Sequence, residues 1–64
     1  MNYKKIKNFQ WLSSCGKFGI EKVAINDAET KFNYNLCEVS EQYDCLRFDA
    51  FDTYELLRDA KGAL

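Results

Sequence analysis

The stretch from Arg47 to Ala60, RFDAFDTYELLRDA, decides the expected fold. From Phe51 on, apolar residues recur at the three- and four-residue spacing of an amphipathic helix; they are Phe51, Tyr54, Leu56, Leu57, Ala60 and Leu64. Acidic residues come early in this segment and Arg58 and Lys61 come late, an order that complements the helix dipole. The pattern predicts a C-terminal helix from Phe51 to about Gly62, where a glycine can end it.

The repeated Phe-Asp pair leaves two registers open for the start of this helix. With Asp52 as the N-cap, Glu55 takes the capping-box position and Phe51 can pack on Leu56. With Asp49 as the N-cap, Asp52 takes that position instead. In either register one aspartate bonds to the backbone, and we expect the other to be free to meet a partner.

The segments before Arg47 favour strands. Residues 17–26 and 42–48 alternate in side-chain direction, and residues 31–39 give the clearest alternation, with Phe32, Tyr34 and Leu36 on one face. Residues 3–12 fit a strand or a helix, and the aromatic content and the following Ser-Ser-Cys-Gly favour a strand. The expected fold class is therefore α+β: three or four antiparallel strands with one C-terminal amphipathic helix packed across one face, in a single domain of residues 1–64.

Size and composition place the chain among small folded domains. It has 64 residues and is 47% hydrophobic and 16% aromatic, too apolar for a disordered segment. A domain this small is marginally stable alone, and its many rings predict an apolar patch left over for a partner.

The net charge of −1 is unevenly distributed along the chain. Residues 1–32 carry +3 and residues 33–64 carry −4. This split permits two-sided association, a homodimer included, and argues against an overall basic footprint for nucleic acid.

The three cysteines favour a reducing, cytoplasmic location. Cys15, Cys37 and Cys45 are odd in number, and neither a signal peptide nor an apolar run long enough to span a membrane is present. We expect packed, reduced thiols and no metal, because a three-thiolate zinc site completed by Asp44 lacks the usual ligand spacing.

Catalytic residues are scarce. The chain has no histidine, and Cys15 is the one cysteine with a neighbourhood, Ser-Cys-Gly-Lys, that could activate a thiol. Acids spaced three apart could hold a cation, but helix capping explains them as well. We expect no enzyme and no cofactor.

A protein-binding module is the function that remains. We expect an inhibitor or adaptor that acts by contact, through an acidic surface and one exposed ring; the predicted partner-binding residues are Asp44, Asp49, Asp52, Glu55, Asp59 and Trp11. The composition is typical of small phage and mobile-element proteins. That style suggests an anti-defence role in which the acids imitate phosphates toward a basic, nucleic-acid-binding host protein.

The alternative is a small nucleic-acid-binding protein. It would use a sheet face that combines cations with aromatic platforms; these residues are Lys4, Lys5, Lys7, Lys17, Lys22, Lys31, Phe9, Trp11 and Phe18. The two arginines, the usual readers of bases, lie in the acidic half, which weighs against this reading.

Overall fold

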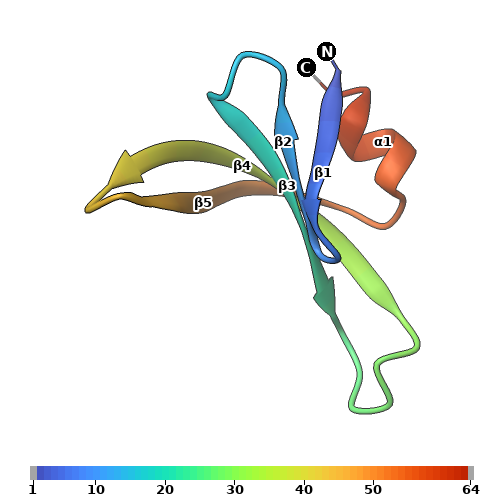
Figure 1. Cartoon of the computed structure of the whole chain (residues 1–64). Coiled ribbons are helices and arrows are strands. Elements are labelled where there is room, and N and C mark those ends of the chain that lie inside the picture. Colours follow the sequence, from blue (N-terminus) through green and yellow to red (C-terminus); the bar gives the residue numbers. More distant parts are fainter. Residues whose placement is uncertain (1, 64) are drawn as a thin grey trace.

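The computed structural model describes residues 2–63 as a five-stranded antiparallel sheet with one short helix (Figure 1). The strands are β1 (Tyr3–Lys7), β2 (Gln10–Ser13), β3 (Phe18–Ala24), β4 (Phe32–Gln42) and β5 (Cys45–Tyr54), and the helix is α1 (Leu57–Lys61). Each strand pairs with the next one along the chain, so the order in the sheet is the order in the sequence.

The predicted fold class is wrong in the number of strands and in the helix. Five strands form the sheet, and α1 has five residues. The stretch from Phe51 to Tyr54, expected to open the helix, continues β5 instead. Even the full helix expected from Phe51 to Gly62 would be marginal on its own hydrogen bonds, whereas the long β4 offers β5 a strand partner up to Tyr54. Phe51, Thr53 and Tyr54 are also residue types that favour strands.

Neither aspartate caps the helix, so both predicted capping registers are wrong. Asp49 and Asp52 lie within β5. The N-cap is Leu56, whose backbone is extended at φ −121° and ψ 137° and whose side chain makes no cap bond. Gly62 is the C-cap as predicted, although its backbone is right-handed at φ −86°.

The strand predictions for the N-terminal part agree with the structure in type. Residues 3–12 are strand, but in two pieces, because the chain turns at 8–9 between β1 and β2. The prediction for residues 17–26 is confirmed by β3. The prediction for residues 31–39 is confirmed by β4, which runs three residues further, to Gln42.

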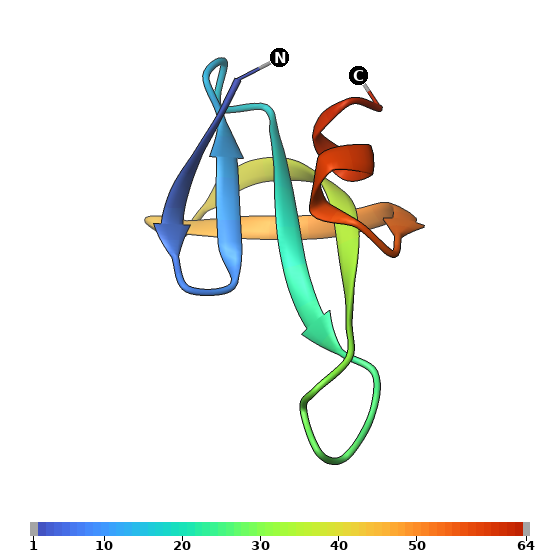
Figure 2. The same ribbon diagram turned by 90° about the vertical axis from the view of Figure 1, so that its right-hand side faces the viewer.

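The core lies between the sheet and α1. Trp11, Ile20 and Leu36 are buried beside one another on adjacent strands, and Ala60 of α1 covers them. The helix lies against β4 and β5 (Figure 2). Partly buried residues complete this cluster: Tyr3, Tyr34, Tyr54 and Leu57. The ring of Tyr34 meets Trp11 edge-on, with centroids 6.0 Å apart, an arrangement that aromatic pairs favour.

The opposite face of the sheet is closed at one point by side chains of β4 and β5. Phe48 and Val39 lie over Gly19 of β3, where a Cβ atom would stand only 2.9 Å from Val39 Cγ2. Cys37 is fully buried on the same face as Gly19, its partner in the register. A glycine at position 19 thus lets the long hairpin of β4 and β5 fold close over β3.

Side chains and a glycine set the two turns that flank β3. Gly16 has φ +76° in the turn between β2 and β3, a backbone conformation that glycine adopts without strain. In the loop between β3 and β4, Asn26 Oδ1 accepts hydrogen bonds from the N–H groups of Thr30 at 3.1 Å and Lys31 at 3.3 Å. The amide of Asn26 therefore substitutes for a backbone partner in this loop.

Candidate interaction surface

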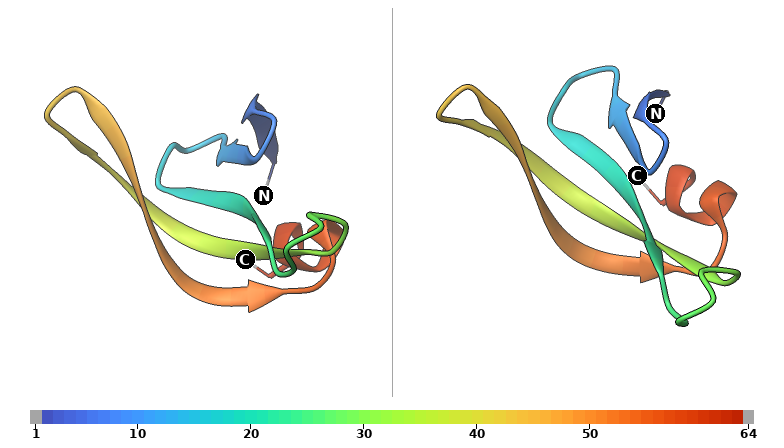
Figure 3. Two further views of the ribbon diagram at one scale, coloured as in Figure 1. Left: turned by 90° about the horizontal axis from the view of Figure 1, so that it is seen from below. Right: turned by 60° about the horizontal axis from the view of Figure 1, so that its bottom comes forward.

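The hairpin of β4 and β5 extends beyond the rest of the sheet as an arm, which we define as residues 39–48 (Figure 1). The pairing of β3 with β4 ends at Glu38, and Val39 donates its N–H to Lys17 O at 2.9 Å. From there on, β4 and β5 have only each other as strand partners within the described chain. Viewed from below, the outer end of the arm stands clear of the helix and of the other strands (Figure 3).

The arm has an apolar face and a polar face, because side chains alternate along both strands. Val39, Leu46 and Phe48 share the apolar face with Glu41, according to the register. The polar face carries Ser40, Gln42 and Arg47, with Glu38 and Asp49 at its base. Leu46 is 47% exposed, more than a strand residue that packs on a core would be.

The tip of the arm is a two-residue turn of unusual composition. Tyr43 and Asp44 have φ values of 53° and 63°, where most two-residue hairpins place Asn-Gly or Asp-Gly. A tyrosine in this left-handed region is strained, at a cost of roughly 1–2 kcal/mol. Its side chain is 94% exposed and therefore returns none of this energy through packing.

Three predicted acidic residues lie on the arm or along β5. Asp44 occupies the tip. Asp49 stands opposite Glu38 in the register, and two like charges directly opposite one another cost stability. Arg47 partly neutralises the charge of Asp49, because its Nε lies 3.1 Å from Asp49 Oδ1. The acids of the arm and its base outnumber Arg47, the cation among them; they are Glu38, Glu41, Asp44 and Asp49.

Asp52 is engaged by its own strand. Its Oδ1 accepts a hydrogen bond from the N–H of Thr53 at 2.9 Å, and its Oδ2 accepts one from the hydroxyl of Tyr54 at 2.8 Å. The hydrogen bond from Tyr54 is the larger cause that lowers the pKa of Asp52, and the bond from Thr53 is the second. The bond between Asp52 and Tyr54 also raises the pKa of Tyr54. Asp52 is thus a fixed anion rather than a freely moving one.

Glu55 and Asp59 lie apart from the arm, before and within α1. Glu55 lines an open hollow of about 410 Å³ together with Lys31, Phe32 and Leu56. The structure therefore divides the predicted acids into a set on the arm and β5 and a set at the helix.

The expectation of an exposed Trp11 is wrong, because its side chain is 8% exposed and lies in the core. The exposed rings are elsewhere, in particular Tyr43 and Phe51, which is 52% exposed and meets Phe18 edge-on. Sequence reasoning missed Tyr43 and Leu46. The alternating residues on either side of Tyr43-Asp44 were the available signal for a hairpin tip there, but that pair lacks the glycine that usually marks such a turn.

The cysteines differ sharply in environment. Cys15 is exposed in the turn after β2, with its Sγ 3.3 Å from Ser13 Oγ. The hydroxyl of Ser13, followed by the Lys17 N–H, lowers the pKa of Cys15. Burial, followed by the charges of Glu21 and Asp49, raises the pKa of Cys37 to about 11. Within residues 2–63, no three His, Cys, Asp or Glu side chains gather closely enough to hold a metal ion.

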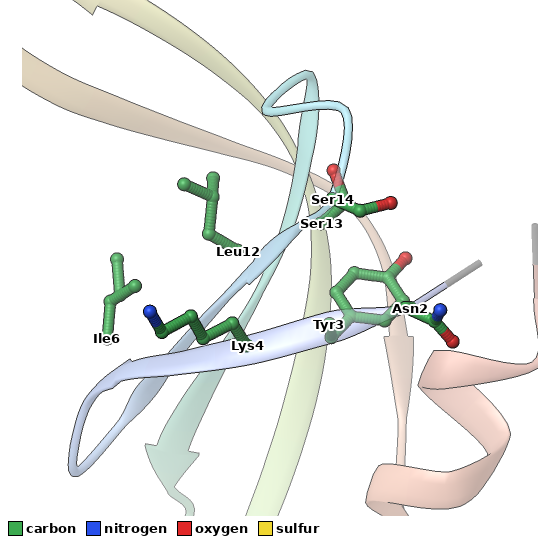
Figure 4. Close-up of a pocket in the computed structure, with 7 residues that line it drawn as sticks. All are labelled: Asn2, Tyr3, Lys4, Ile6, Leu12, Ser13 and Ser14. Atoms are coloured by element: carbon green, nitrogen blue, oxygen red, sulfur yellow. The ribbon is translucent and has the colours of Figure 1, made fainter.

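A second hollow, of about 280 Å³, lies at the β1 and β2 edge of the sheet (Figure 4). Leu12, Ile6 and the stem of Lys4 line one side, and Tyr3 and Ser13 lie on the other. The Tyr3 hydroxyl is buried and has no hydrogen-bond partner in the described chain. Burial and the nearby Cys15 raise the pKa of Tyr3. The hollow is open, and its volume is below the usual range of small-molecule sites.

The lysines do not form one track on the sheet. Lys5 and Lys22 lie on the face that carries α1, and Lys4 lies on the other. Two of these cations already rest on rings, since Lys22 Nζ is 4.0 Å from the Phe32 centroid and Lys5 Nζ is 5.8 Å from the Trp11 centroid. In these contacts the ammonium groups of the two lysines lie against aromatic rings of the same chain.

Comparison of the chain with protein-family models, curated proteins and solved structures gives no match. Among the described residues, α1 is far too short to span a membrane, and no other helix is present.

Proposed function

We propose that this chain is a non-enzymatic protein-binding module, an inhibitor or adaptor that acts by contact, and that the tip of the arm meets the partner. The observation that carries the proposal is Tyr43, a ring that is 94% exposed on a strained turn at the end of a projecting hairpin. Backbone strain of this kind clusters at functional sites. Tyrosine is also a residue type enriched at interface hot spots.

The charges of the arm favour a basic partner surface. Asp44 lies beside Tyr43, and Glu41 lies two residues before it. Acids around an aromatic anchor would steer the arm toward lysines and arginines and set its orientation there. A basic groove of the kind that binds nucleic acid fits this description, consistent with a phage-type protein that blocks a host factor.

The experiment compares three variants in affinity capture from a lysate, followed by quantitative mass spectrometry. The tip variant carries Tyr43→Ser and Asp44→Lys, and we expect it to lose a protein that the wild type retains. The helix variant carries Glu55→Lys and Asp59→Lys. The loop variant carries Asp27→Lys and Glu29→Lys as a matched charge control.

Circular dichroism first establishes that all three variants are folded. Loss of the captured protein in the tip variant alone supports the proposal. Equal capture by the tip variant and the wild type contradicts it, and loss only in the helix variant moves the interface to Glu55 and Asp59.

Nucleic-acid binding remains the alternative function, with less support. The cations that would serve it lie on both faces of the sheet, and Lys22 is already on Phe32. A labelled oligonucleotide titrated at low salt tests it, since phosphate contacts weaken steeply as salt rises. The absence of a shift with folded protein would remove this alternative.

A further inference from the structure

The two edges of the sheet are protected to different degrees. β1 is a short edge of five residues with Lys4, Lys5 and Lys7, and its pairing is broken by an irregularity after Lys5. Lysines and bulges are the usual protection of an edge strand against pairing with another chain. β5 is an edge of ten residues that contains neither lysine nor proline. Its outer row of backbone groups is therefore the better template for a further strand.

The register identifies which residues of β5 present these backbone groups. Val39 donates its N–H to Lys17, on the β3 side of β4. Its partner in β5, Phe48, therefore forms a non-hydrogen-bonded pair with β4, and the N–H and C=O of Phe48 point outward. The same holds for Leu46 and Ala50, two residues away on either side. Three residues in a regular stretch of β5 thus offer free donors and acceptors.

We propose that β5 pairs with β5 of a second copy of this chain, antiparallel and around a two-fold axis at Phe48. In this register Phe48 faces Phe48 of the second copy, and Leu46 faces Ala50 of the second copy. All the outward backbone groups of these residues then find partners. The pairing joins the two sheets into one continuous sheet, an isologous contact that closes as a dimer.

Side-chain charge selects this register over its neighbours. Arg47 comes to stand opposite Asp49 of the second copy, and Asp49 opposite Arg47 of the second copy. Both side chains are more than half exposed, at 61% and 54%. In the single chain they bond to each other at 3.1 Å, and in the dimer each would turn to the opposite charge of the second copy. A register shifted by two residues in one direction opposes Arg47 to Arg47, and in the other direction Asp49 to Asp49. Like charges directly opposite on neighbouring strands are unfavourable.

The apolar face of the arm gains cover from the same pairing. Leu46, 47% exposed in the single chain, would lie beside Ala50 of the second copy. The turn at Tyr43-Asp44 and the irregularity of β5 at Phe51 limit the new ladder to the regular stretch between them. At each end of the new ladder, Asp44 of one copy would stand opposite Asp52 of the other copy. The repulsion between these two carboxylates also opposes a longer ladder.

Sedimentation equilibrium of the full chain tests the dimer. The single variants Arg47→Asp and Asp49→Arg each place like charges opposite one another twice, and we expect each to raise the dimer Kd about tenfold. The double variant, which carries both changes, restores opposite charges and should recover the wild-type Kd. Single variants that dimerise like the wild type, or a double variant that stays weak, would overturn the register.

A backbone variant tests the edge itself. Ala50→Pro removes an outward N–H without touching a bond to β4, and proline is tolerated at such edge positions. We expect a folded monomer, with circular dichroism unchanged. Lys4→Glu on the β1 edge is the matched control and should leave the dimer intact. A wild-type chain that is monomeric at about 1 mM, a dimer that survives Ala50→Pro, or a dimer lost with Lys4→Glu would refute β5 pairing.

Discussion

The ring of Phe48 lies over the backbone of Gly19, two strands away in the sheet, in the place that a Cβ atom at position 19 would occupy. Trp11 O and Val39 Cγ2, each 2.9 Å from that position, close the other sides. This contact fixes how closely the base of the arm approaches β3.

Gly19→Ala should destabilise the chain by about 1–3 kcal/mol, the usual result of forcing a methyl group into filled space. One of the atoms it meets belongs to the backbone, which cannot move aside alone. Urea unfolding measures the loss. Gly62→Ala is the matched control, because the nearest atom there is Arg58 O at 3.4 Å and the backbone is right-handed, so little change is expected. Equal effects of the two changes would contradict the packing described for Phe48.

Replacing Tyr43-Asp44 with Asn-Gly should stabilise the fold and abolish partner binding. Both residues have positive φ, which Asn and Gly adopt at lower cost, so we expect a gain of roughly 1–2 kcal/mol. Thermal unfolding and affinity capture are measured on the same protein. A variant that gains stability and still binds would show that Tyr43 is not the anchor.

Cys15 should react with iodoacetamide much faster than Cys37 at neutral pH. The lowered pKa of Cys15 increases its thiolate fraction, whereas Cys37 is buried and its pKa is raised to about 11. Mass spectrometry of the alkylated peptides gives both rates. Ser13→Ala removes the hydroxyl beside the sulfur and should slow Cys15. An unchanged rate in that folded variant would assign the reactivity to exposure alone.

Asp52 should contribute to the pH dependence of stability on the acid side. Its pKa is lowered in the folded chain, so its contribution is complete above the unfolded value near 4 and is lost as pH falls through the folded value. Asp52→Asn keeps an acceptor for the Tyr54 hydroxyl but does not titrate. In urea unfolding from pH 6 to about pH 2, the advantage of the wild type over this variant should disappear. A constant difference would exclude the linkage.

The sequence predicted the central strands well because their alternation is local. Phe32, Tyr34 and Leu36 define one face without reference to any other segment, and the antiparallel neighbours follow from the short connections. The helix predicted from Phe51 on was wrong for the opposite reason, because a distant segment decides it. Phe51, Tyr54 and Leu57 fit a helical stripe, and only the presence of β4 alongside decides that the first two extend a strand.

The candidate site could be predicted only in part. The acidic character of residues 38–59 is visible in the sequence, but their division between the arm and the helix depends on where β5 ends. Trp11 was expected to be the exposed ring of the interface, yet it lies in the core with Ala60, a residue far along the chain. The prominence of Tyr43 arises from the length of β4 and β5 beyond β3, which no local pattern encodes.

The strand order has a consequence for how fast the native state is reached. Because every strand pairs with its neighbour in the chain, each pairing closes only a short loop, and no early strand has to wait for a late one. Low contact order of this kind favours rapid folding for an all-strand topology. The first four strands can pair without β5, which then adds to the edge of β4. Stopped-flow refolding should therefore be quicker than for sheets of similar length whose first and last strands are paired.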